Sequence, residues 1–350
     1  MTGKYMAYVG SYSYTGKAKG ITVYDVDVEA GKFIYRCEVE VDNSSYLKSS
    51  QNGKILYSIA DEGVVAFRVL PNGSLARLNS AKIKGMRGCH LSTSKADDYI
   101  FISGFHDGKI TVLHLNKDGS VGDIADGVFH KGLGSVAERS FRPHVSCSRL
   151  TPDERFLMVA DLGIDQIKVY RFDHKDGKIT LVDTIRCELE SAPKYFMFSS
   201  DGRFFYVLYE MKNVIEVYSY KEGERVPIVE KIQTISSTGS KPNQLTAACA
   251  MHFSPDEKHV FCSNAGDNTV SMYDRDDETG MLTMRFCLPI SGDYPKDIAI
   301  FPDGKHLASI NHEGSISFFK IDYDKGLLVM SDRSIKVNEP NCCEIVKIGD

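Results

Sequence analysis

A short phrase repeats along the whole length of this chain. Each copy has a polar turn, usually a basic residue, and then a short apolar strand, as in residues 200–206 (SDGRFFY). The turns lie at positions 3, 53, 98, 154, 202, 257 and 304, so their spacing runs from 45 to 56 residues. A unit that recurs at a period of about 20–50 residues indicates a repeat architecture. We therefore expect an array of seven similar units.

Each unit is predicted to form four β-strands. Residues 156–160 (FLMVA) are apolar, residues 166–172 (QIKVYRF) alternate apolar with charged side chains, and residues 179–182 (ITLV) form the last strand. Residues 176–177 (DG) suit a tight hairpin because they tolerate a positive φ. No segment has a helical period over about 11 residues or more. The predicted fold is all-β: a seven-bladed β-propeller with four antiparallel strands per blade, formed by residues 1–350 as a single domain.

The two ends of the chain are expected to complete one blade together. The chain begins at the second strand of a unit, residues 5–12, and ends with an unmatched apolar strand, residues 342–348. This C-terminal strand would lie innermost, pair with the N-terminal blade and close the ring. Closure removes two exposed sheet edges, which otherwise favour aggregation.

Composition and charge exclude several classes of protein. The 42 Lys and Arg residues are interspersed with 47 Asp and Glu residues, which argues against a nucleic-acid binder with a wholly basic surface. No run approaches the roughly 18 apolar residues of a membrane helix. Residues 1–10 do not resemble a signal peptide. We expect a cytoplasmic monomer with neither a nucleic-acid nor a membrane partner.

The cysteines point to the same compartment. They are nine in number, widely scattered and without a Cys-x-x-Cys pair, so neither a disulfide framework nor a zinc site is expected. Reduced thiols among apolar neighbours are typical of the cytoplasm. The absence of tryptophan excludes the Trp-Asp signature of WD40 repeats. No spacing of His, Cys, Asp or Glu supports a metal site.

Segments that enter the innermost strands of a propeller form one mouth of its channel. In this chain they carry potential cations: His90, His144, Lys194 and Lys296, with Arg139 and Arg142 just upstream of His144. Loops that follow second strands reach the same mouth, and they supply Glu210 and Asn264. In a chain that is acidic overall, a cationic funnel favours a small anionic ligand.

The sequence also resembles the seven-bladed propeller lactonases, a family that includes bacterial 6-phosphogluconolactonase and the fungal carboxymuconate-lactonizing enzyme. The motifs that carry the resemblance extend over essentially the whole chain: residues 8–12 (YVGSY), 20–24 (GITVY), 45–47 (SYL), 88–92 (GCHLS), 142–144 (RPH), 159–165 (VADLGID), 263–266 (SNAG) and 340–342 (PNC). The stretch 160–165 is the most specific of these. The resemblance implies a lactone hydrolase, which needs no cofactor because the ester carbonyl is already electrophilic.

The resemblance also places the family's proposed site on four positions of this chain. Glu210 is retained, and Lys194 stands where the family has an arginine. Ser146 and Ala265 stand where the family has a histidine and an arginine. Lysine keeps the positive charge but lacks the bidentate hydrogen bonding of arginine. The resemblance therefore supports the family's fold for this chain more directly than it supports the family's substrate.

Each candidate catalytic residue has a functional role and a plainer alternative. Glu210 would activate a water molecule as general base, or be a solvated loop carboxylate. Lys194 would stabilise an oxyanion or hold a phosphate, or simply pair with Glu210 at the rim. His144 would shuttle a proton, or tie adjacent blades through backbone carbonyls.

The remaining candidates would bind substrate. Another family arginine corresponds to Lys296, which is followed by the retained Asp297. The long segment 127–142 is expected to be a flap over the mouth, or else a solvated loop. The expected substrate-binding residues are Arg139, Arg142, Ser146, His90, Asn264, Lys296 and Asp297.

Two functions from different classes follow. The first is a lactone hydrolase of carbohydrate metabolism, by resemblance acting on 6-phosphogluconolactone of the pentose phosphate pathway, with Glu210 as base and Lys194 balancing the charge on the tetrahedral intermediate. The second is a non-catalytic propeller that binds a small anionic ligand such as a sugar acid, which Ser146 and Ala265 favour. A related lactonase or cycloisomerase with another substrate is a third, narrower alternative.

Overall fold

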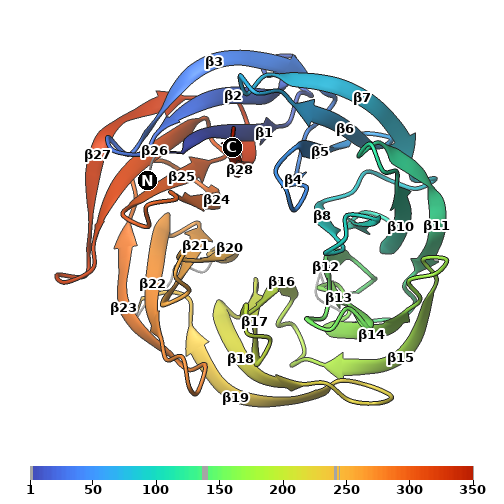
Figure 1. Cartoon of the computed structure of the whole chain (residues 1–350). Helices are drawn as coiled ribbons and strands as arrows, with labels where there is room; N and C mark the ends of the chain where they lie inside the picture. The colour runs from blue at the N-terminus through green and yellow to red at the C-terminus, as the bar shows by residue number, and fades with distance from the viewer. Residues whose placement is uncertain (1–2, 136–140, 240–242, 244, 350) are drawn as a thin grey trace. The chain divides into compact units, whose positions relative to one another are not determined.

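The fold is all-β. The computed structural model describes residues 3–135, 141–239, 243 and 245–349. Within these ranges the chain forms 28 strands and no helix. The strands make seven separate sheets, each of four antiparallel strands (Figure 1). The predicted seven-bladed β-propeller is confirmed, with one sheet for each sequence repeat.

The chain divides into two compact units. The first unit comprises residues 1–47, 69–75 and 235–350, and the second comprises residues 48–68 and 76–234. Three sheets belong to the first unit. In strand order they are β28 (Pro340–Ile348), β1 (Lys4–Ser11), β2 (Gly20–Asp27) and β3 (Lys32–Glu40); β20 (Ala247–Phe253), β21 (His259–Ala265), β22 (Thr269–Arg275) and β23 (Leu282–Pro289); β24 (Pro295–Ile300), β25 (His306–Asn311), β26 (Ser315–Asp322) and β27 (Leu327–Lys336).

Four sheets lie wholly or mainly in the second unit. Their strands, in the same kind of order, are β4 (Leu47–Ser49), β5 (Ile55–Ala60), β6 (Gly63–Val69) and β7 (Leu75–Lys82); β8 (His90–Thr93), β9 (Tyr99–Gly104), β10 (Lys109–Leu115) and β11 (Val121–Phe129); β12 (Val145–Leu150), β13 (Phe156–Asp161), β14 (Gln166–Phe172) and β15 (Ile179–Arg186); β16 (Pro193–Phe198), β17 (Phe204–Tyr209), β18 (Val214–Lys221) and β19 (Ile228–Ser236).

Both ends of the chain contribute to one sheet of the first unit, as predicted. Strand β28 is antiparallel to β1, in a register that runs from Lys4 opposite Ile348 to Ser11 opposite Pro340. The C-terminal strand therefore takes the first place in the order β28-β1-β2-β3. It begins two residues earlier than the sequence suggested, at Pro340.

Stacking of the sheets explains why second strands are apolar on both faces. Along β13, Leu157 and Val159 enter the core shared with sheet β8–β11. The alternate residues Phe156, Met158 and Ala160 enter the core shared with sheet β16–β19. Fully burying a large apolar side chain contributes about 1.5–3 kcal/mol. Successive residues of β13 thus stabilise two different interfaces.

The prediction that the apolar residues of the third strand share one side, opposite its charged residues, was wrong for β14. Ile167 and Val169 face one core, whereas Tyr170 and Phe172 face the other. Lys168 is also buried, and its Nζ donates to the carbonyl of Lys131 at 3.4 Å. Burial lowers the pKa of Lys168, while Asp161 opposes the effect. A sheet covered on both faces leaves no solvent side, so the long side chain reaches a carbonyl instead.

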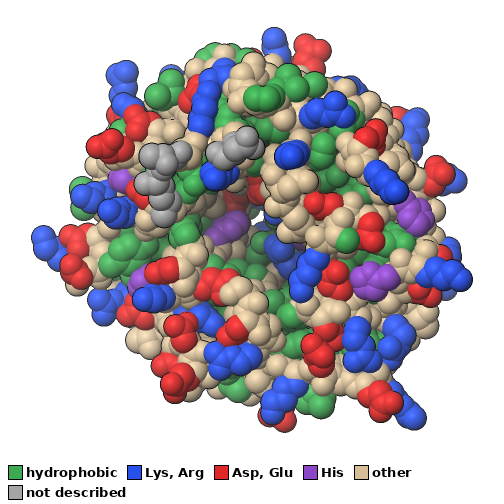
Figure 2. All heavy atoms as spheres, in the orientation of Figure 1, with side chains coloured by type: hydrophobic (Ala, Val, Ile, Leu, Met, Phe, Trp, Pro, Cys, Tyr) green, Lys and Arg blue, Asp and Glu red, His purple; other side chains and the backbone are tan. Residues whose placement is uncertain are grey.

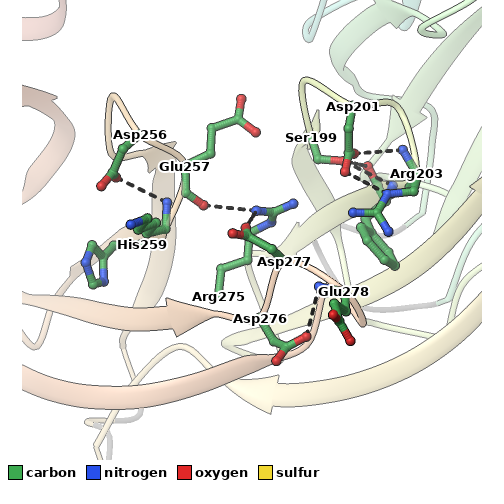
Figure 3. Close-up of polar contacts among 12 residues, drawn as sticks. Ser199, Asp201, Arg203, Asp256, Glu257, His259, Arg275, Asp276, Asp277 and Glu278 are labelled. Atoms are coloured by element: carbon green, nitrogen blue, oxygen red, sulfur yellow. Dashed lines mark hydrogen bonds and ion pairs between the residues drawn. The ribbon is translucent and has the colours of Figure 1, made fainter.

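The polar turn of the repeat is held by its own side chains. At the turn before β17, Ser199 Oγ donates to Asp201 Oδ1 at 2.6 Å, and Arg203 Nε lies 2.8 Å from Asp201 Oδ2 (Figure 3). In the first unit, Ser254 Oγ donates to Asp256 Oδ1 at 2.6 Å in the same way. These short side chains satisfy backbone groups locally, so the turn specifies where each second strand starts.

The surface carries charges of both signs. On the face shown in Figure 2, Lys and Arg side chains are mixed with Asp and Glu side chains. None of the described residues forms a helix long and apolar enough to span a membrane.

Candidate active site

The second unit brings Lys194 and Glu210 into direct contact. Glu210 is the first residue after β17, and its backbone N–H donates to the carbonyl of Ala192 at 2.9 Å. The Nζ atom of Lys194 lies 2.7 Å from Oε2 of Glu210, and their side chains are 24% and 10% exposed. The pair is largely buried, so it combines the burial that a general base needs with the pairing expected of a rim lysine.

A backbone irregularity in β16 positions Lys194. Pro193 lies opposite Tyr209 and Tyr195 lies opposite Leu208, which leaves Lys194 as an extra residue in the strand. Such β-bulges redirect side chains and are common beside active sites. The register of β12 shifts in the same way at Ser146. Ser146 and Lys194, two of the positions that the family resemblance marked, are therefore equivalent bulge residues.

The same irregularity recurs in the first unit. The register of β24 shifts at Lys296, that of β20 shifts at Cys249, and that of β28 shifts at Asn341. Of these three, only Lys296 was predicted as a site residue. Cys249 could have been identified from its spacing, because it lies eight residues before the repeat turn at 257, as Lys194 lies eight residues before the turn at 202.

His144 is held firmly in front of β12. Its backbone N–H donates to Asp161 Oδ1 at 2.7 Å, and its Nδ1–H donates to the carbonyl of Phe105 at 2.7 Å. The imidazole also stacks on Phe105, with ring centroids 4.4 Å apart. The expected backbone tie between blades is present. It uses Nδ1, so in the neutral ring the lone pair for proton transfer is on Nε2.

Asp161 organises this part of the site. Besides His144, it accepts a hydrogen bond at 2.7 Å from Nδ1 of His130, which is completely buried. Burial lowers the pKa of His130, and the contact with Asp161 opposes that change. Asp161, which lies in the motif of residues 160–165, therefore fixes the backbone conformation at His144.

Ser146 and His90 are occupied by contacts within the protein. Ser146 Oγ donates to the carbonyl of Pro193 at 3.1 Å and to that of Ala160 at 3.4 Å. His90 is buried; its Nδ1 accepts from the N–H of Ser148 at 3.5 Å, and its Nε2 contacts the sulfur of Cys147 at 3.6 Å. Burial above all, then Arg149 and Lys48, lowers the pKa of His90 well below its usual value. A substrate-binding role for either residue stays a prediction.

The candidates of the first unit form a set of their own. Asp297 is buried, and its Oδ1 accepts from His252 Nε2 at 2.8 Å. Lys296 Nζ lies 5.0 Å from the centroid of the Tyr294 ring. Asn264 is fully buried and its Nδ2 donates to the carbonyl of Ser237 at 2.7 Å. His252 was not anticipated, since nothing in its local sequence shows that it meets Asp297.

The connection predicted over residues 127–142 starts later in the structure, and its role as a flap stays a prediction. Its first three residues belong to β11, which continues to Phe129 because it pairs with β10. Arg142 is exposed, with its guanidinium 5.7 Å from the Phe141 ring centroid. Arg139 lies outside the described residues. Among the described side chains, no group of three or more His, Cys, Asp or Glu residues is arranged to hold a metal ion.

A family model described as lactonase, 7-bladed beta-propeller, matches residues 6–345. The chain belongs to this lactonase family. A 6-phosphogluconolactonase of Bacillus subtilis is 27% identical over 350 residues, covering 98% of this chain and 99% of the relative. The crystal structure of a candidate 6-phosphogluconolactonase from Bacteroides fragilis is 30% identical, with a TM-score of 0.89 over 99% of this chain and 98% of that one.

A third similarity supports the fold alone. The periplasmic gluconolactonase PpgL of Pseudomonas aeruginosa superposes with a TM-score of 0.92 over 99% of this lactonase and 100% of that chain, at 23% identity. Membership of the family makes lactone hydrolysis the reaction class of this protein. Within the described site, the bulge residue Lys194 and Glu210, which follows β17, place an ammonium group and a carboxylate in contact.

Proposed function

We propose that this lactonase hydrolyses a sugar lactone, with 6-phosphogluconolactone as its substrate. The observation that carries the proposal is the buried Lys194–Glu210 pair at the end of β16 and β17. It places a carboxylate and an ammonium group side by side in a site largely shielded from water. The relatives named 6-phosphogluconolactonase support the choice of substrate.

The chemistry needs one base and one cation. The Glu210 carboxylate accepts a proton from a water molecule, whose oxygen forms a bond to the lactone carbonyl carbon. Lys194 donates a hydrogen bond to the carbonyl oxygen and stabilises the negative charge of the tetrahedral intermediate. The bond between that carbon and the ring oxygen then breaks, and the ring oxygen receives the proton that Glu210 accepted from water. Nε2 of His144 can carry this proton, because its Nδ1 is held by the Phe105 carbonyl.

Pairing and burial act on Glu210 in opposite directions. A neighbouring ammonium stabilises the ionised carboxylate and weakens it as a base, whereas loss of hydration strengthens it. When substrate arrives, the carbonyl oxygen competes with Glu210 for the hydrogen bonds of Lys194. The carboxylate becomes more basic at the moment when it must accept a proton.

The test is the initial rate of 6-phosphogluconolactone hydrolysis, corrected for spontaneous ring opening. We expect Glu210→Gln to lower kcat by about 100-fold or more, the usual contribution of a positioned base. Glu216→Gln is a matched control, because Glu216 pairs with Lys231 at 2.8 Å and its side chain is 11% exposed. Unchanged turnover in Glu210→Gln, or an equal loss in both variants, would refute the mechanism.

A non-catalytic binding module is the second candidate function. Ser146 donates to backbone carbonyls and Ala265 has no functional group, although the family resemblance places cationic or basic residues at both positions. This alternative is supported if the parent protein binds 6-phosphogluconate but hydrolyses neither phosphorylated nor neutral sugar lactones.

A further inference from the structure

His130 is a buried histidine that the proposed mechanism does not use. It is the first residue after β11, and its backbone N–H donates to the carbonyl of Gly108 at 2.8 Å. Its side chain is completely buried and reaches Asp161, the last residue of β13. The sheets that contain β11 and β13 share one apolar core. Burying two ionisable groups costs free energy, which the hydrogen bonds of this pair must offset.

The hydrogen bonds of the pair determine where the proton of His130 lies. Asp161 Oδ2 lies 2.7 Å from Nδ1 of His130, so a neutral His130 carries its proton on Nδ1. Its Nε2 atom is buried and has no hydrogen-bond partner among the described residues. A second proton on Nε2 would be an unsatisfied donor, and burial also lowers the pKa of His130. His130 therefore acts as a neutral donor to Asp161.

Two side chains of β14 restrict the position of this imidazole. Tyr170 stacks on it, with ring centroids 6.0 Å apart. The buried Lys168 donates from Nζ to the carbonyl of Lys131, the residue after His130, at 3.4 Å. Lys168 also disfavours a positive charge on His130, because it helps burial to lower the pKa of that residue. The donor to Asp161 is therefore fixed in both its position and its protonation.

Asp161 transmits this constraint to His144. Its Oδ1 accepts from the backbone N–H of His144 at 2.7 Å and from that of Gly163 at 3.2 Å. A Cβ atom on Gly163 would lie 2.7 Å from Cδ2 of His144, the ring carbon bonded to Nε2. Because Oδ2 is occupied by His130, the carboxylate cannot rotate away from these two N–H groups without leaving a buried imidazole N–H unpaired.

The position of His144 matters for the catalytic pair. Its Nδ1–H donates to the carbonyl of Phe105 at 2.7 Å, so Nε2 is the atom that carries a proton in the proposed mechanism. Two residues later, Ser146 Oγ donates to the carbonyl of Pro193, the residue before Lys194, at 3.1 Å. A displacement of about 1 Å at a group that transfers a proton can lower the rate by about 100-fold.

We propose that His130 is a positioning residue of this lactonase: its Nδ1–H fixes the Asp161 carboxylate, which holds His144 with Nε2 in place for proton transfer. The proposal rests on the function proposed above. Because the His130 side chain is completely buried, it acts through Asp161 and His144 and does not contact the substrate. Loss of its hydrogen bond should therefore lower kcat and leave KM nearly unchanged.

Two substitutions separate the hydrogen bond of His130 from its packing. Asparagine bears its amide group on Cγ, the carbon that bears Nδ1 in histidine, so His130→Asn keeps a donor and loses the ring. His130→Phe keeps a ring beside Tyr170 and loses the donor. The readout is hydrolysis of 6-phosphoglucono-δ-lactone, corrected for spontaneous opening. We expect His130→Phe to lower kcat about tenfold or more with KM changed by less than about twofold, and His130→Asn to recover most of the parent kcat.

Tyr99→Phe is the matched control. Tyr99 lies in β9 of the same sheet, and its hydroxyl donates to the carbonyl of His174 at 3.0 Å, a contact that does not involve Asp161. It should lower the stability of the sheet and leave kcat unchanged, with urea unfolding reporting the stability of each variant. If His130→Phe does not fold, His130→Leu replaces it, because leucine has the shape of asparagine and no donor. A parent-like kcat in the variant without a donor, or an equal fall in His130→Asn, would overturn the proposal.

The positioning can also be measured without turnover. If the parent protein hydrolyses no sugar lactone, the proposed function fails, and long-range proton–nitrogen spectra of the histidine side chains are recorded at a pH where imidazoles are neutral. The parent and His130→Asn should show a single tautomer of His144, with its proton on Nδ1. His130→Phe should show two tautomers in exchange. A His144 spectrum in His130→Phe that is identical to that of the parent refutes the positioning role.

Discussion

The Lys194–Glu210 pair allows a quantitative test of its burial. Replacing Lys194 by Met keeps the apolar stem of the side chain and removes its charge, which leaves the Glu210 carboxylate in a site where its side chain is only 10% exposed. Breaking a buried ion pair by removing one partner costs about 3–5 kcal/mol. Because Lys194 itself is 24% exposed, we expect a cost near the lower limit, about 3 kcal/mol.

The two single substitutions, Lys194→Met and Glu210→Gln, should lower the free energy of unfolding by different amounts. Glu210→Gln leaves a lysine whose long stem can carry the ammonium group into water. A loss of about 1 kcal/mol in the free energy of unfolding is therefore expected. In Lys194→Met/Glu210→Gln neither charge of this pair remains, and a loss of about 1–2 kcal/mol in the free energy of unfolding is expected. The double variant should therefore be more stable than Lys194→Met alone. This inequality does not depend on the absolute values, because only Lys194→Met keeps the buried Glu210 carboxylate while it removes the adjacent cation.

Equilibrium unfolding in urea measures these differences, and far-UV circular dichroism can follow it in a chain that has no tryptophan. The dependence of the free energy on urea should have the same slope in all four proteins, which shows that only stability changed. A cost below about 1 kcal/mol for Lys194→Met would mean that the Glu210 carboxylate gains little from Lys194. Strict additivity of the two single substitutions would mean that the side chains do not interact. Either result would refute the buried pair on which the proposed function rests.

Three further predictions concern the scaffold. Burial raises the pKa of Asp201, but hydrogen bonds from Ser199 and Arg203 outweigh this effect and lower the pKa from 3.8 to about 2. The stabilisation from the Asp201 carboxylate is therefore full above about pH 4 and is lost as the pH falls through about 2. Asp201→Asn should lower the free energy of unfolding by about 1 kcal/mol at pH 7, a value kept small because the side chain is 37% exposed. Thermal unfolding of both proteins at pH 7 and at pH 2 should show that their difference in stability vanishes in acid. Truncation before Pro340 removes β28 and exposes β1, so size-exclusion chromatography should show aggregation that the full chain does not. Thiol titration without reductant should find nine free thiols after denaturation, with Cys89 slow to react in the native protein because its pKa is about 12.

The sequence alone was sufficient for the architecture. Turn residues such as Asp201 act through backbone groups two residues away, and apolar strands such as β17 follow directly. Both signals are local, and seven copies of one signal leave little freedom in the count of blades. The pairing of the C-terminal strand could be predicted because an unmatched strand at one end needed a partner at the other.

The site could be predicted only in part. Glu210 and Lys194 were selected by position and resemblance, but their contact and their burial required the structure. The side chains of β14 were assigned to the wrong faces, because alternation within a strand cannot show that other sheets cover both of its faces. The bulge at Lys194 is equally invisible in the pattern, since one extra residue leaves the composition of the strand unchanged.

The surroundings of His144 show where sequence reasoning stops. His144 meets Phe105 and Asp161, which come from other connections and strands, and no local pattern relates the three. Backbone sterics and hydrophobic periodicity act over a few residues, so they determine strands, turns and the number of repeats. Which side chains meet depends on the register of each strand and on the close approach of turns at Gly108 and Gly163. Those distances are set only when the sheets stack, and they decide the chemistry of the site.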